Sequence, residues 1–390
     1  MKRARTILSV LALFVAAGIQ TAVAEISSAP SWYIDGTEQY EQLFYISSAG
    51  DVNGDGYEDV VVGNQWRYGG IGHVSLYYGS SSGLSTTPAW TVANDQESSA
   101  FGHATGIGDV NGDGYGDVLV SAHQYSNGQI NEGRAYVYYG SATGLKPSAD
   151  WMIESNQPGA LLGFRPMNIS GDLNKDGYDD VIIASCGYNN DTGQASIYYG
   201  SAAGLSTTPG WTVTGDQVGG SFGFASCIAG DVNGDGWLDV IIGTGYYNNG
   251  LPNAGRVYVY YGSASGLSTT PNLIIEGKQA GGNFGDRVAP AGDVNGDGYD
   301  DIIVGAYWYN NGVPQEGAAF VYYGSATGLN ANNYSIVSTG VAGASVGWVN
   351  KVGDVNNDGY DDVIIGSPWY DGMRGKAFIY LGSKNGLNTT

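Results

Sequence analysis

One acidic motif recurs six times along the chain and limits what the chain can fold into. Its first copy, from Asp51 to Gly63, reads DVNGDGYEDVVVG, and the other copies begin at Asp109, Asp172, Asp231, Asp293 and Asp354. Successive copies start 58, 63, 59, 62 and 61 residues apart. A steady period of this length indicates supersecondary units that stack or are arranged radially.

The repeat around Asp231 shows what one unit is expected to form. The apolar stretch SFGFASCIA precedes the acidic loop, DVIIG follows it, and the alternating run RVYVYYGS and the short run NLIIEG complete the unit. Four short runs joined by turns rich in Gly, Asn and Pro predict an antiparallel meander of four strands. No segment after the N-terminal leader has the sustained 3.6-residue period of a helix.

Sheets of this size bury their faces when they pack radially as the blades of a propeller. The aromatic residue at motif position 7 and the tyrosines of the YYG segments are expected to fill the space between blades. We therefore predict an all-β fold, a six-bladed β-propeller of four-stranded antiparallel blades.

The two ends of the chain predict how the ring closes. The last residues, Gly386–Thr390, read GLNTT, and Pro30–Gly36 reads PSWYIDG. Joined, they rebuild the GLSTTPAW segment of Gly83–Trp90. We therefore expect Trp32–Ile34 to be the fourth strand of the last blade, paired antiparallel with Lys376–Gly382.

The N-terminus has the pattern of a secretory signal peptide. The basic start MKRAR precedes an apolar run over Ile7–Gly18, and Ala22-Val23-Ala24 places small residues at the cleavage site. The apolar run is shorter than the ~20 residues of a membrane span. We expect residues 1–24 to be removed, leaving a single propeller domain over residues 25–390 that is secreted into an extracellular or periplasmic space.

Net charge excludes two classes of partner. The formal charge is −22, and removal of the leader, with three basic and no acidic residues, makes it −25. Such a chain repels nucleic acid and anionic membranes. Eighteen of the 37 acidic residues lie at motif positions 1, 5 and 9, so the charge belongs to the loops and does not indicate disorder.

The acidic loops have the composition of calcium sites. In all six copies, positions 1, 3 and 5 are Asp, Asn and Asp, position 6 is Gly and position 9 is Asp. Ca²⁺ takes six to eight oxygen ligands, which these side chains and the backbone carbonyl of position 7 could supply. We predict up to six Ca²⁺ ions. The candidate ligands are Asp51, Asn53, Asp55, Tyr57 and Asp59; Asp109, Asn111, Asp113, Tyr115 and Asp117; Asp172, Asn174, Asp176, Tyr178 and Asp180; Asp231, Asn233, Asp235, Trp237 and Asp239; Asp293, Asn295, Asp297, Tyr299 and Asp301; and Asp354, Asn356, Asp358, Tyr360 and Asp362.

Two other interpretations of these loops were weighed. An EF-hand requires Glu at position 12 and a following helix, whereas position 12 here is Val or Ile in every copy and a strand-like run follows. Hairpin turns without metal are the second interpretation, but a turn alone does not require Asp at both positions 1 and 9. Mg²⁺ rarely uses a cage made only of protein ligands.

The loops and their surroundings resemble the FG-GAP repeat of the integrin α-subunit β-propeller. The FG element stands before the acidic loop at Phe101-Gly102, Phe222-Gly223 and Phe284-Gly285, and the GAP element survives in part at Gly305-Ala306-Tyr307 and Gly366-Ser367-Pro368. The FG element is altered to Leu-Gly and Val-Gly in the third and sixth repeats and is absent from the first. The resemblance spans nearly all of the mature chain.

The resemblance implies structural calcium on the face opposite the ligand. The integrin head has seven blades, which is the alternative to six, and carries calcium loops in only some of them. No inserted domain, leg or membrane anchor is present in this sequence, so the receptor role does not transfer. We expect a binding or adhesion module for an extracellular glycan or protein. The alternative is a calcium-dependent enzyme, a lyase or hydrolase, that acts on polysaccharide.

Candidate ligand-binding residues lie in the hairpin loops after the second strand of each repeat. Each loop places Trp or Tyr beside Asn, Gln or Asp, which suits sugars and polar protein surfaces, although ordinary turn chemistry gives the same composition. These residues are Trp66, Tyr68, Tyr125, Tyr188, Tyr246, Tyr247, Trp308, Tyr309, Trp369 and Tyr370. We expect Trp308, Tyr309 and Trp369 to be partly exposed and to cluster with Tyr246 and Tyr247.

The remaining reactive side chains predict little chemistry. His103 and His123 are expected to approach one face of the second blade as packing residues. No nucleophile, phosphate-binding or zinc-protease motif is present. Cys186 and Cys227 lie in different repeats, and both a disulfide and two buried thiols fit the sequence.

Overall fold

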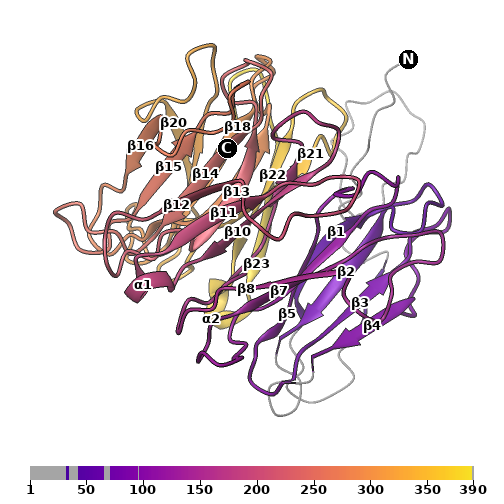
Figure 1. Cartoon of the computed structure of the whole chain (residues 1–390). Coiled ribbons are helices and arrows are strands. Elements are labelled where there is room, and N and C mark those ends of the chain that lie inside the picture. The colour runs from indigo at the N-terminus through magenta and orange to yellow at the C-terminus, as the bar shows by residue number, and fades with distance from the viewer. Residues whose placement is uncertain (1–31, 35–42, 66–70, 95, 389–390) are drawn as a thin grey trace, which may run out of the picture.

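The structure of the chain is a computed structural model that describes residues 32–34, 43–65, 71–94 and 96–388. Its strands form six antiparallel sheets, one per repeat, in which successive strands are neighbours. The prediction of six blades is therefore confirmed. Figure 1 shows the sheets following one another around the molecule from the indigo N-terminal part to the yellow C-terminal part.

Each sheet is named here as a blade, numbered in chain order. Blade 1 is β1 (Leu43–Gly50), β2 (Asp59–Asn64), β3 (His73–Tyr77) and β4 (Trp90–Ala93); blade 2 is β5 (Phe101–Gly106), β6 (Val118–Ala122), β7 (Arg134–Tyr138) and β8 (Trp151–Glu154); blade 3 is β9 (Ser170–Gly171), β10 (Asp180–Ser185), β11 (Gln194–Tyr198) and β12 (Trp211–Thr214). Blade 4 is β13 (Ala225–Gly230), β14 (Asp239–Thr244), β15 (Arg256–Tyr260) and β16 (Leu273–Glu276); blade 5 is β17 (Phe284–Gly292), β18 (Asp301–Ala306), β19 (Ala318–Tyr322) and β20 (Tyr334–Val337); blade 6 is β21 (Trp348–Gly353), β22 (Asp362–Ser367) and β23 (Lys376–Tyr380).

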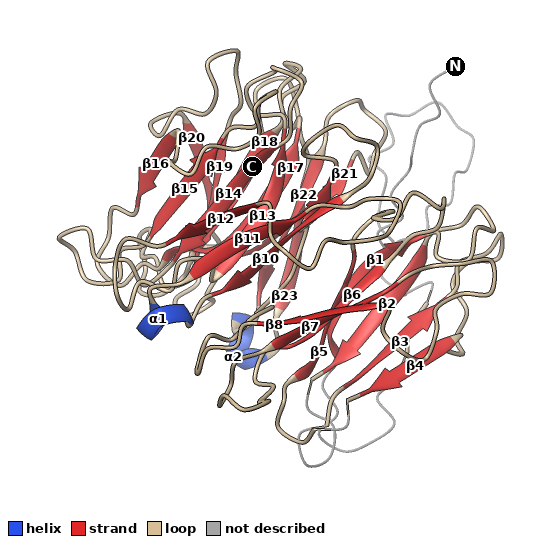
Figure 2. Ribbon diagram, viewed as in Figure 1, coloured by secondary structure: helices blue, strands red, loops and turns tan. Residues whose placement is uncertain are grey.

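Only two short helical turns occur in the described part of the chain, as the sequence predicts. They are α1 (Tyr188–Asp191) and α2 (Tyr370–Met373), both in hairpin loops between the second and third strands of their blades. Asn189 and Asn190 have positive φ, so α1 is a sequence of turns and not a regular helix. Figure 2 shows both elements at the lower ends of their strands in that view. None of the described helices is long and apolar enough to cross a membrane.

The hydrophobic core lies between neighbouring blades. One buried cluster joins blades 2, 3 and 4 through residues such as Leu119, Ile182 and Ile242. Other clusters join blades 1 and 2, blades 4 and 5, and blades 5 and 6. The second strand of each blade supplies most of the fully buried β-branched residues, because both of its faces are covered by adjacent blades.

The predicted pairing of the N-terminal segment with the last blade is wrong for the described residues. β23 pairs only with β22, so blade 6 has three strands. Trp32 and Ile34 pack against Val60, Val62 and Tyr77 of blade 1. Side-chain contacts hold this segment there: the ring of Trp32 lies 5.4 Å from that of Tyr77, and its Nε1 donates to the Ser85 carbonyl at 2.8 Å.

Trp32 contacts blade 1 in the same way that the tryptophan of a fourth strand contacts the blade that follows it. Trp90 of β4 contacts Tyr138 of the next blade, with 5.0 Å between ring centroids, and donates to the Lys146 carbonyl at 2.9 Å. Trp211 of β12 makes the same two kinds of contact with blade 4. The similarity between the chain ends therefore predicts the packing of Trp32 on the next blade but not its strand pairing.

Cys186 and Cys227 are free thiols, and both are buried. Of the two alternatives that the sequence leaves open, the structure shows the second. Burial raises the pKa of Cys186 to about 12, so this thiol stays protonated at neutral pH and behaves as a small apolar side chain.

Candidate functional site

The acidic loops gather motif positions 1, 3 and 5 by short hydrogen bonds. In blade 4, Asp231 accepts from the backbone N–H groups of Asp235, at 3.1 Å, and Gly236, at 2.7 Å. Asn233 Nδ2 donates to Asp235 Oδ2 at 3.2 Å. The same bonds recur in all six loops. Side chains of this kind hold a turn and present oxygen atoms on one side of it.

The aspartate at position 9 is inside the blade. Asp59, Asp117, Asp180, Asp239, Asp301 and Asp362 all have no exposed surface. In blade 4, Asp239 Oδ2 accepts from the Val232 N–H at 2.9 Å, and Oδ1 accepts from the Gly262 N–H at 2.8 Å. This carboxylate therefore joins its own loop to the end of the third strand. Sequence reasoning assigned it only to metal binding and missed this structural role.

Each position 9 carboxyl has a raised pKa. Burial raises the pKa of Asp239 to about 7, and the carboxylates of Asp235 and Asp231 add to that rise, while the two backbone N–H groups oppose it. The corresponding values are about 7 for Asp180 and about 8 for Asp301. Three carboxylates thus lie near one another in each loop, and no ion pair among the described residues joins any of them to Lys or Arg.

These residues fit a hard cation by their chemistry, because carboxylate and amide oxygens are the ligands that Ca²⁺ prefers. Burial is the main cause of the raised pKa of Asp239, and a cation would offset the smaller contribution that the carboxylates of Asp235 and Asp231 make. Within the described residues, no group of three or more carboxylate, imidazole or thiol side chains converges on one metal position. Calcium binding therefore stays a prediction for all six loops.

The loops also join consecutive blades. In blade 5, the position 8 N–H of Asp300 donates to the Asp231 carbonyl of blade 4 at 3.2 Å, and Ser325 N–H donates to the Val232 carbonyl at 3.1 Å. We call this pair of backbone bonds the acidic-end latch. It also joins blades 1 and 2, 2 and 3, and 5 and 6. Among the described residues, it is absent between blades 3 and 4 and between blades 6 and 1.

The residue type at motif position 4 differs between the loops that form the acidic-end latch and the two loops that do not. It is Gly54, Gly112, Gly234 or Gly296 in the four latched loops, and the position 7 ring of the next blade lies against it. A Cβ on Gly296 would lie 2.6 Å from Tyr360 Cε1. In the two unlatched loops position 4 is Lys175 or Asn357, both with positive φ. This difference in the sequence could have revealed the two distinct junctions.

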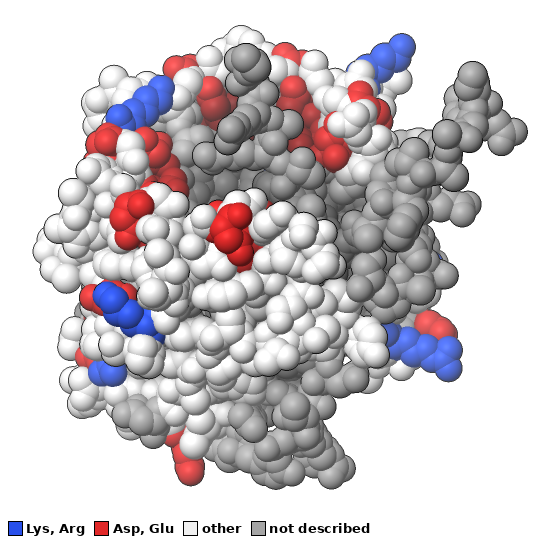
Figure 3. Space-filling model, turned by 90° about the vertical axis from the view of Figure 1, so that its right-hand side faces the viewer, with Lys and Arg blue, Asp and Glu red and all other residues white. Residues whose placement is uncertain are grey.

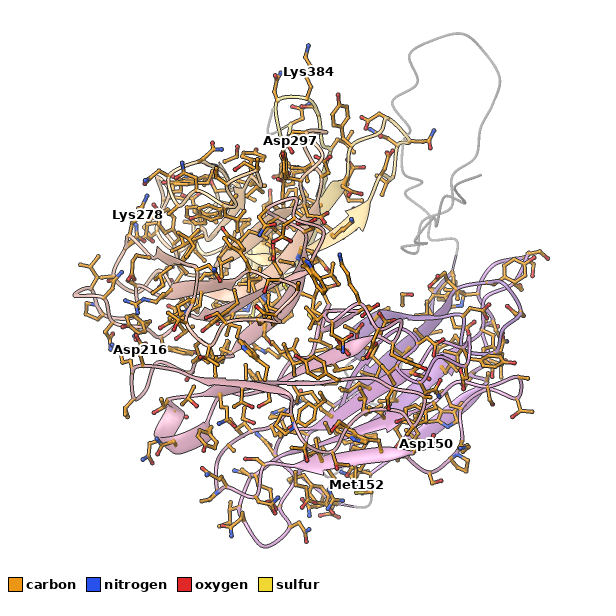
Figure 4. All side chains as sticks on the ribbon, turned by 45° about the horizontal axis from the view of Figure 1, so that its top comes forward. Asp150, Met152, Asp216, Lys278, Asp297 and Lys384 are labelled. Atoms are coloured by element: carbon orange, nitrogen blue, oxygen red, sulfur yellow. The ribbon has the colours of Figure 1, made fainter. Side chains whose placement is uncertain are left out.

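On the face shown in Figure 3, acidic side chains gather toward the upper end, and basic side chains lie both at the corners of that end and lower down. Asp297, in the loop of blade 5, and Lys384, after β23, lie on one side of the molecule, and Asp216 lies away from both (Figure 4). Asp216 belongs to the loops at the opposite ends of the strands, which we call the axial face. That face carries the hairpin loops of the predicted ligand site.

The residue that follows each FG element lies near the propeller axis on the axial face. Ring centroids of Tyr45 and His103 are 4.0 Å apart, and those of Phe164 and Phe224 are 5.1 Å apart. Phe164 also contacts His103, at 6.0 Å. Side chains from blades 1 to 4 thus form a continuous cluster, which Asp286, Arg287 and Trp348 of blades 5 and 6 extend. The FG elements are recognisable in the sequence, but the residue that follows them varies in type and therefore gives no signal of this cluster.

His103 and His123 do meet, as packing residues of this cluster. Their ring centroids are 4.8 Å apart, and both side chains are buried. His103 Nδ1 accepts from the Arg165 N–H at 3.0 Å. Burial lowers the pKa of His123 to about 4 and lowers that of His103 as well.

The candidate ligand residues divide into two groups. Tyr246, Trp308 and Trp369 face the axial cluster: Tyr246 contacts Phe224 at 5.4 Å, and the rings of Trp308 and Trp369 are 4.9 Å apart. Tyr246 and Trp369 are exposed, and Trp308 is half-buried. The structure thus shows the predicted partial exposure of Trp308 and Trp369 and their contact with each other. Tyr246 is exposed as well, but the ring that it contacts is Phe224 and not either tryptophan.

The other tyrosines pack on the third strands of their own blades. Tyr125 lies 3.7 Å below the guanidinium of Arg134, Tyr247 lies 3.6 Å from that of Arg256, and Tyr309 contacts Phe320. Tyr370 likewise contacts Phe378 of β23. Tyr188 lies in α1 and is half-buried. Trp66 and Tyr68 are outside the described residues. Tyr247 and Tyr309 thus have a structural role and do not join the exposed cluster.

Comparisons with known proteins agree with these repeats. The FG-GAP repeat family matches residues 170–198, 222–260, 284–322 and 346–380, and an FG-GAP-like repeat family matches residues 51–120. Phosphatidylinositol-glycan-specific phospholipase D of Bos taurus is 33% identical over 52% of this chain and 25% of its own length. Integrin alpha pat-2 of Caenorhabditis briggsae is 33% identical over 54% of this chain and 18% of its own length. Integrin alpha-V of Gallus gallus is 29% identical over 59% of this chain and 22% of its own length. The chain thus spans a quarter or less of each of these relatives.

Proposed function

Because the chain belongs to the FG-GAP repeat proteins, we propose that it is an exported β-propeller that binds Ca²⁺ in its acidic loops and an extracellular ligand on its axial face. The leader pattern of residues 1–24 supports export. Relatives named as integrin alpha chains support a binding or adhesion role for the propeller. The ligand class that the axial face suits is a glycan or a polar protein surface.

One observation carries the calcium proposal: three carboxylates lie close together in each of six loops, and the most buried of them has a raised pKa. Positions 1, 3 and 5 and the carbonyl of position 7 would hold the ion, and position 9 would complete the set. Bound Ca²⁺ would supply positive charge and no chemistry. Six ions would add twelve positive charges to a mature chain of formal charge −25.

Calorimetric titration of the chelator-treated protein with Ca²⁺ tests this proposal. We expect binding at several loops and a melting temperature that chelation lowers well beyond the effect of added NaCl, since a ligand that binds only the folded state stabilises it. Mg²⁺ is expected to replace Ca²⁺ poorly. The absence of any binding heat with Ca²⁺, together with a melting temperature that chelator leaves unchanged, would refute it.

The enzyme alternative is tested in the same preparation. Incubation with acidic and neutral polysaccharides should leave the number of reducing and unsaturated ends unchanged if the protein is a binding module. Release of new ends would support the alternative, a lyase or hydrolase on a propeller scaffold.

A further inference from the structure

We propose that the axial face is a carboxylate-binding site built around Arg165 and that its ligand is a uronic acid residue of an acidic glycan. The proposal rests on the proposed function, because it names the ligand class of the same face. Arg165 differs from the other described arginines, each of which forms an ion pair with a carboxylate.

Arg165 has no acidic partner. Arg134 pairs with Glu154, Arg256 with Asp216 and Glu276, Arg287 with Asp286 and Arg374 with Asp371. No carboxylate of the described residues lies within ion-pair distance of Arg165. Arg165 is therefore the described arginine whose charge is left unpaired, although the protein carries a large excess of acid.

The guanidinium of Arg165 is held in place among aromatic rings. Its carbon lies 4.7 Å from the ring centroid of Phe164, 4.8 Å from that of Phe224 and 5.9 Å from that of Trp348. It also hydrogen-bonds to the Tyr45 hydroxyl. The side chain is half-buried, so its charge is partly desolvated. A guanidinium has five N–H donors in a planar fork, and one phenol leaves most of them free for a ligand.

A second guanidinium adds to the positive charge at the axis. Arg287 is buried and its ion pair with Asp286 is 2.8 Å long. Burial lowers the pKa of Arg287 to about 10, and the charge of Arg165 also acts to lower it. Two guanidiniums and one carboxylate leave one net positive charge in a partly apolar setting. An unpaired charge of this kind is costly, and an anionic ligand would pair it.

The aromatic side chains beside this charge favour a sugar. Arg287 lies 4.3 Å from the ring centroid of Trp348. On the same side of the axis, Tyr307 contacts both Trp308, at 4.9 Å, and Trp369, at 5.6 Å. Trp369 is 41% exposed and Tyr246 is 38% exposed, and Tyr246 contacts Phe224, on whose ring the guanidinium of Arg165 lies. A sugar ring can stack on such aromatic rings while its carboxylate pairs with Arg165. A peptide is more often held by backbone bonds along a strand edge or in a groove.

The distribution of charge limits the ligand to a short segment or a chain end. The acidic loops and the overall charge repel a long polyanion, whereas the positive charge is confined to the axis. One or a few uronate residues would therefore contact the axial face, and the rest of the glycan would extend away from the protein.

The test is calorimetric titration in calcium-containing buffer with trimers of galacturonate, glucuronate, mannuronate and guluronate. The methyl ester of each trimer is the matched neutral control. We expect at least one acid trimer to bind and its ester to bind about tenfold more weakly, the effect of losing one charged bidentate contact. No binding by any acid trimer, or equal binding of acid and ester, would overturn the proposal.

Arg165→Met tests the residue itself, because Met keeps the contacts with Phe164 and Phe224 and removes the charge. We expect about a tenfold loss of affinity for the acid trimer. Arg134→Met is the control, since Arg134 also lies over an aromatic ring, that of Tyr125, but is paired with Glu154; it should bind like the wild type. Unchanged affinity in Arg165→Met would overturn the proposal.

Trp369→Ala keeps the test decisive if Arg165→Met fails to fold, because Trp369 is exposed. It should weaken binding of the acid trimer and leave the melting temperature nearly unchanged, whereas unchanged binding in a folded Trp369→Ala would count against the site.

Two further outcomes identify other ligands or sites. If hexaglutamate binds and no uronate trimer does, the ligand is an acidic peptide and not a glycan. Uronate binding that chelator abolishes and Arg165→Met leaves intact would place the ligand on calcium in the acidic loops and overturn the axial site. Calcium titration of each variant reports separately on the proposed function.

Discussion

In each acidic loop, the aspartate at position 9 is buried in the blade, whereas the aspartate at position 5 bonds only within the loop. Substitutions at the two positions can therefore distinguish a role in folding from a role in metal binding. Asp239 is fully buried and accepts two backbone N–H groups from different segments of blade 4. Asp235 is exposed and bonds only within its own loop. The two residues are four positions apart in one motif, so substitutions at each are matched in chemistry.

Asp239→Asn should destabilise the protein even in chelator. The amide has a single acceptor oxygen, so one backbone N–H would face an NH₂ group and lose its partner, which costs about 1–3 kcal/mol. Asp235→Asn should change the free energy of unfolding in chelator by about 0.5 kcal/mol or less and should weaken calcium binding by its loop. Urea denaturation with and without calcium measures both effects. Equal destabilisation by the two substitutions in chelator would contradict the structural role of position 9.

The buried histidines predict acid sensitivity. The pKa of His123 is about 4 in the folded protein because burial disfavours the charged ring, and it is about 6.5 in an unfolded chain. The folded state thus binds fewer protons between these values, so this contribution to stability is complete above pH 6.5 and is lost as the pH falls to 4. The shift corresponds to about 3 kcal/mol.

His123→Phe should remove that dependence while keeping the contacts with Phe164 and His103. Urea denaturation in calcium at several pH values measures the free energy of unfolding. Between pH 6.5 and 4 this free energy should decrease in both proteins, and the decrease in His123→Phe should be smaller than that of the wild type by about 3 kcal/mol. Parallel curves for the two proteins would show that His123 does not titrate in this range.

At the level of the element, the acidic loop of each latched blade receives the position 7 ring of the next blade. Gly296 and Gly298 are two residues apart in one loop, and both have positive φ. A Cβ on Gly296 would lie 2.6 Å from the ring of Tyr360 in blade 6, whereas a Cβ on Gly298 would meet nothing within 4 Å. The pair separates backbone conformation from contact between blades.

Gly298→Ala should cost about 1 kcal/mol, because alanine is disfavoured at positive φ. Gly296→Ala should cost about 1–3 kcal/mol more, because the ring of Tyr360 must move and the contact between blades is lost. Thermal denaturation of the two variants beside the wild type gives the comparison. Equal melting temperatures for Gly296→Ala and Gly298→Ala would mean that this contact contributes nothing.

The strands could be predicted because each repeat alternates apolar runs with turn residues, and position 9 begins the second strand in five blades and directly precedes it in blade 2. The axial cluster could not, since the residue after each FG element is Tyr, His, Phe or another type, and only the convergence of six blades brings these side chains together. The role of the third-strand arginines was also hidden. Arg134 and Arg256 hold Tyr125 and Tyr247 by contacts between segments that the sequence pattern does not relate.

For the whole molecule, the junction between the last and the first blade depends on few contacts. Trp32 lies on blade 1 as Trp211 lies on blade 4, but it is half-buried whereas Trp211 is buried. Across the axis, Asn168 Nδ2 donates to Asn350 Oδ1 at 2.7 Å, which joins blades 3 and 6. No hydrophobic cluster of the described residues spans blades 6 and 1.

Trp32→Ala should therefore destabilise the protein by about 1–2 kcal/mol, since a half-buried ring loses less than a buried one. Trp211→Ala, the matched substitution inside the ring, should cost about 3–5 kcal/mol. Differential scanning calorimetry of both variants measures the effects. A Trp32→Ala protein as stable as the wild type would show that this segment does not help to close the ring.

The pattern of the acidic-end latch divides the molecule into two groups of blades. Blades 1 to 3 are latched to one another, as are blades 4 to 6, and the two junctions without the latch separate the groups. The junction of blades 3 and 4 keeps a shared core and the bond from Ile228 N–H to the Asn168 carbonyl, whereas the described residues show neither at the junction of blades 6 and 1. We therefore expect the ring to move as two groups of blades, with a hinge at the junction of blades 3 and 4 and an opening at the junction of blades 6 and 1. The opening that costs the least free energy would separate blades 6 and 1 while blades 3 and 4 stay packed. In a hydrogen-exchange experiment, amide hydrogens of β1 and β23 should therefore exchange before those of β10 and β14.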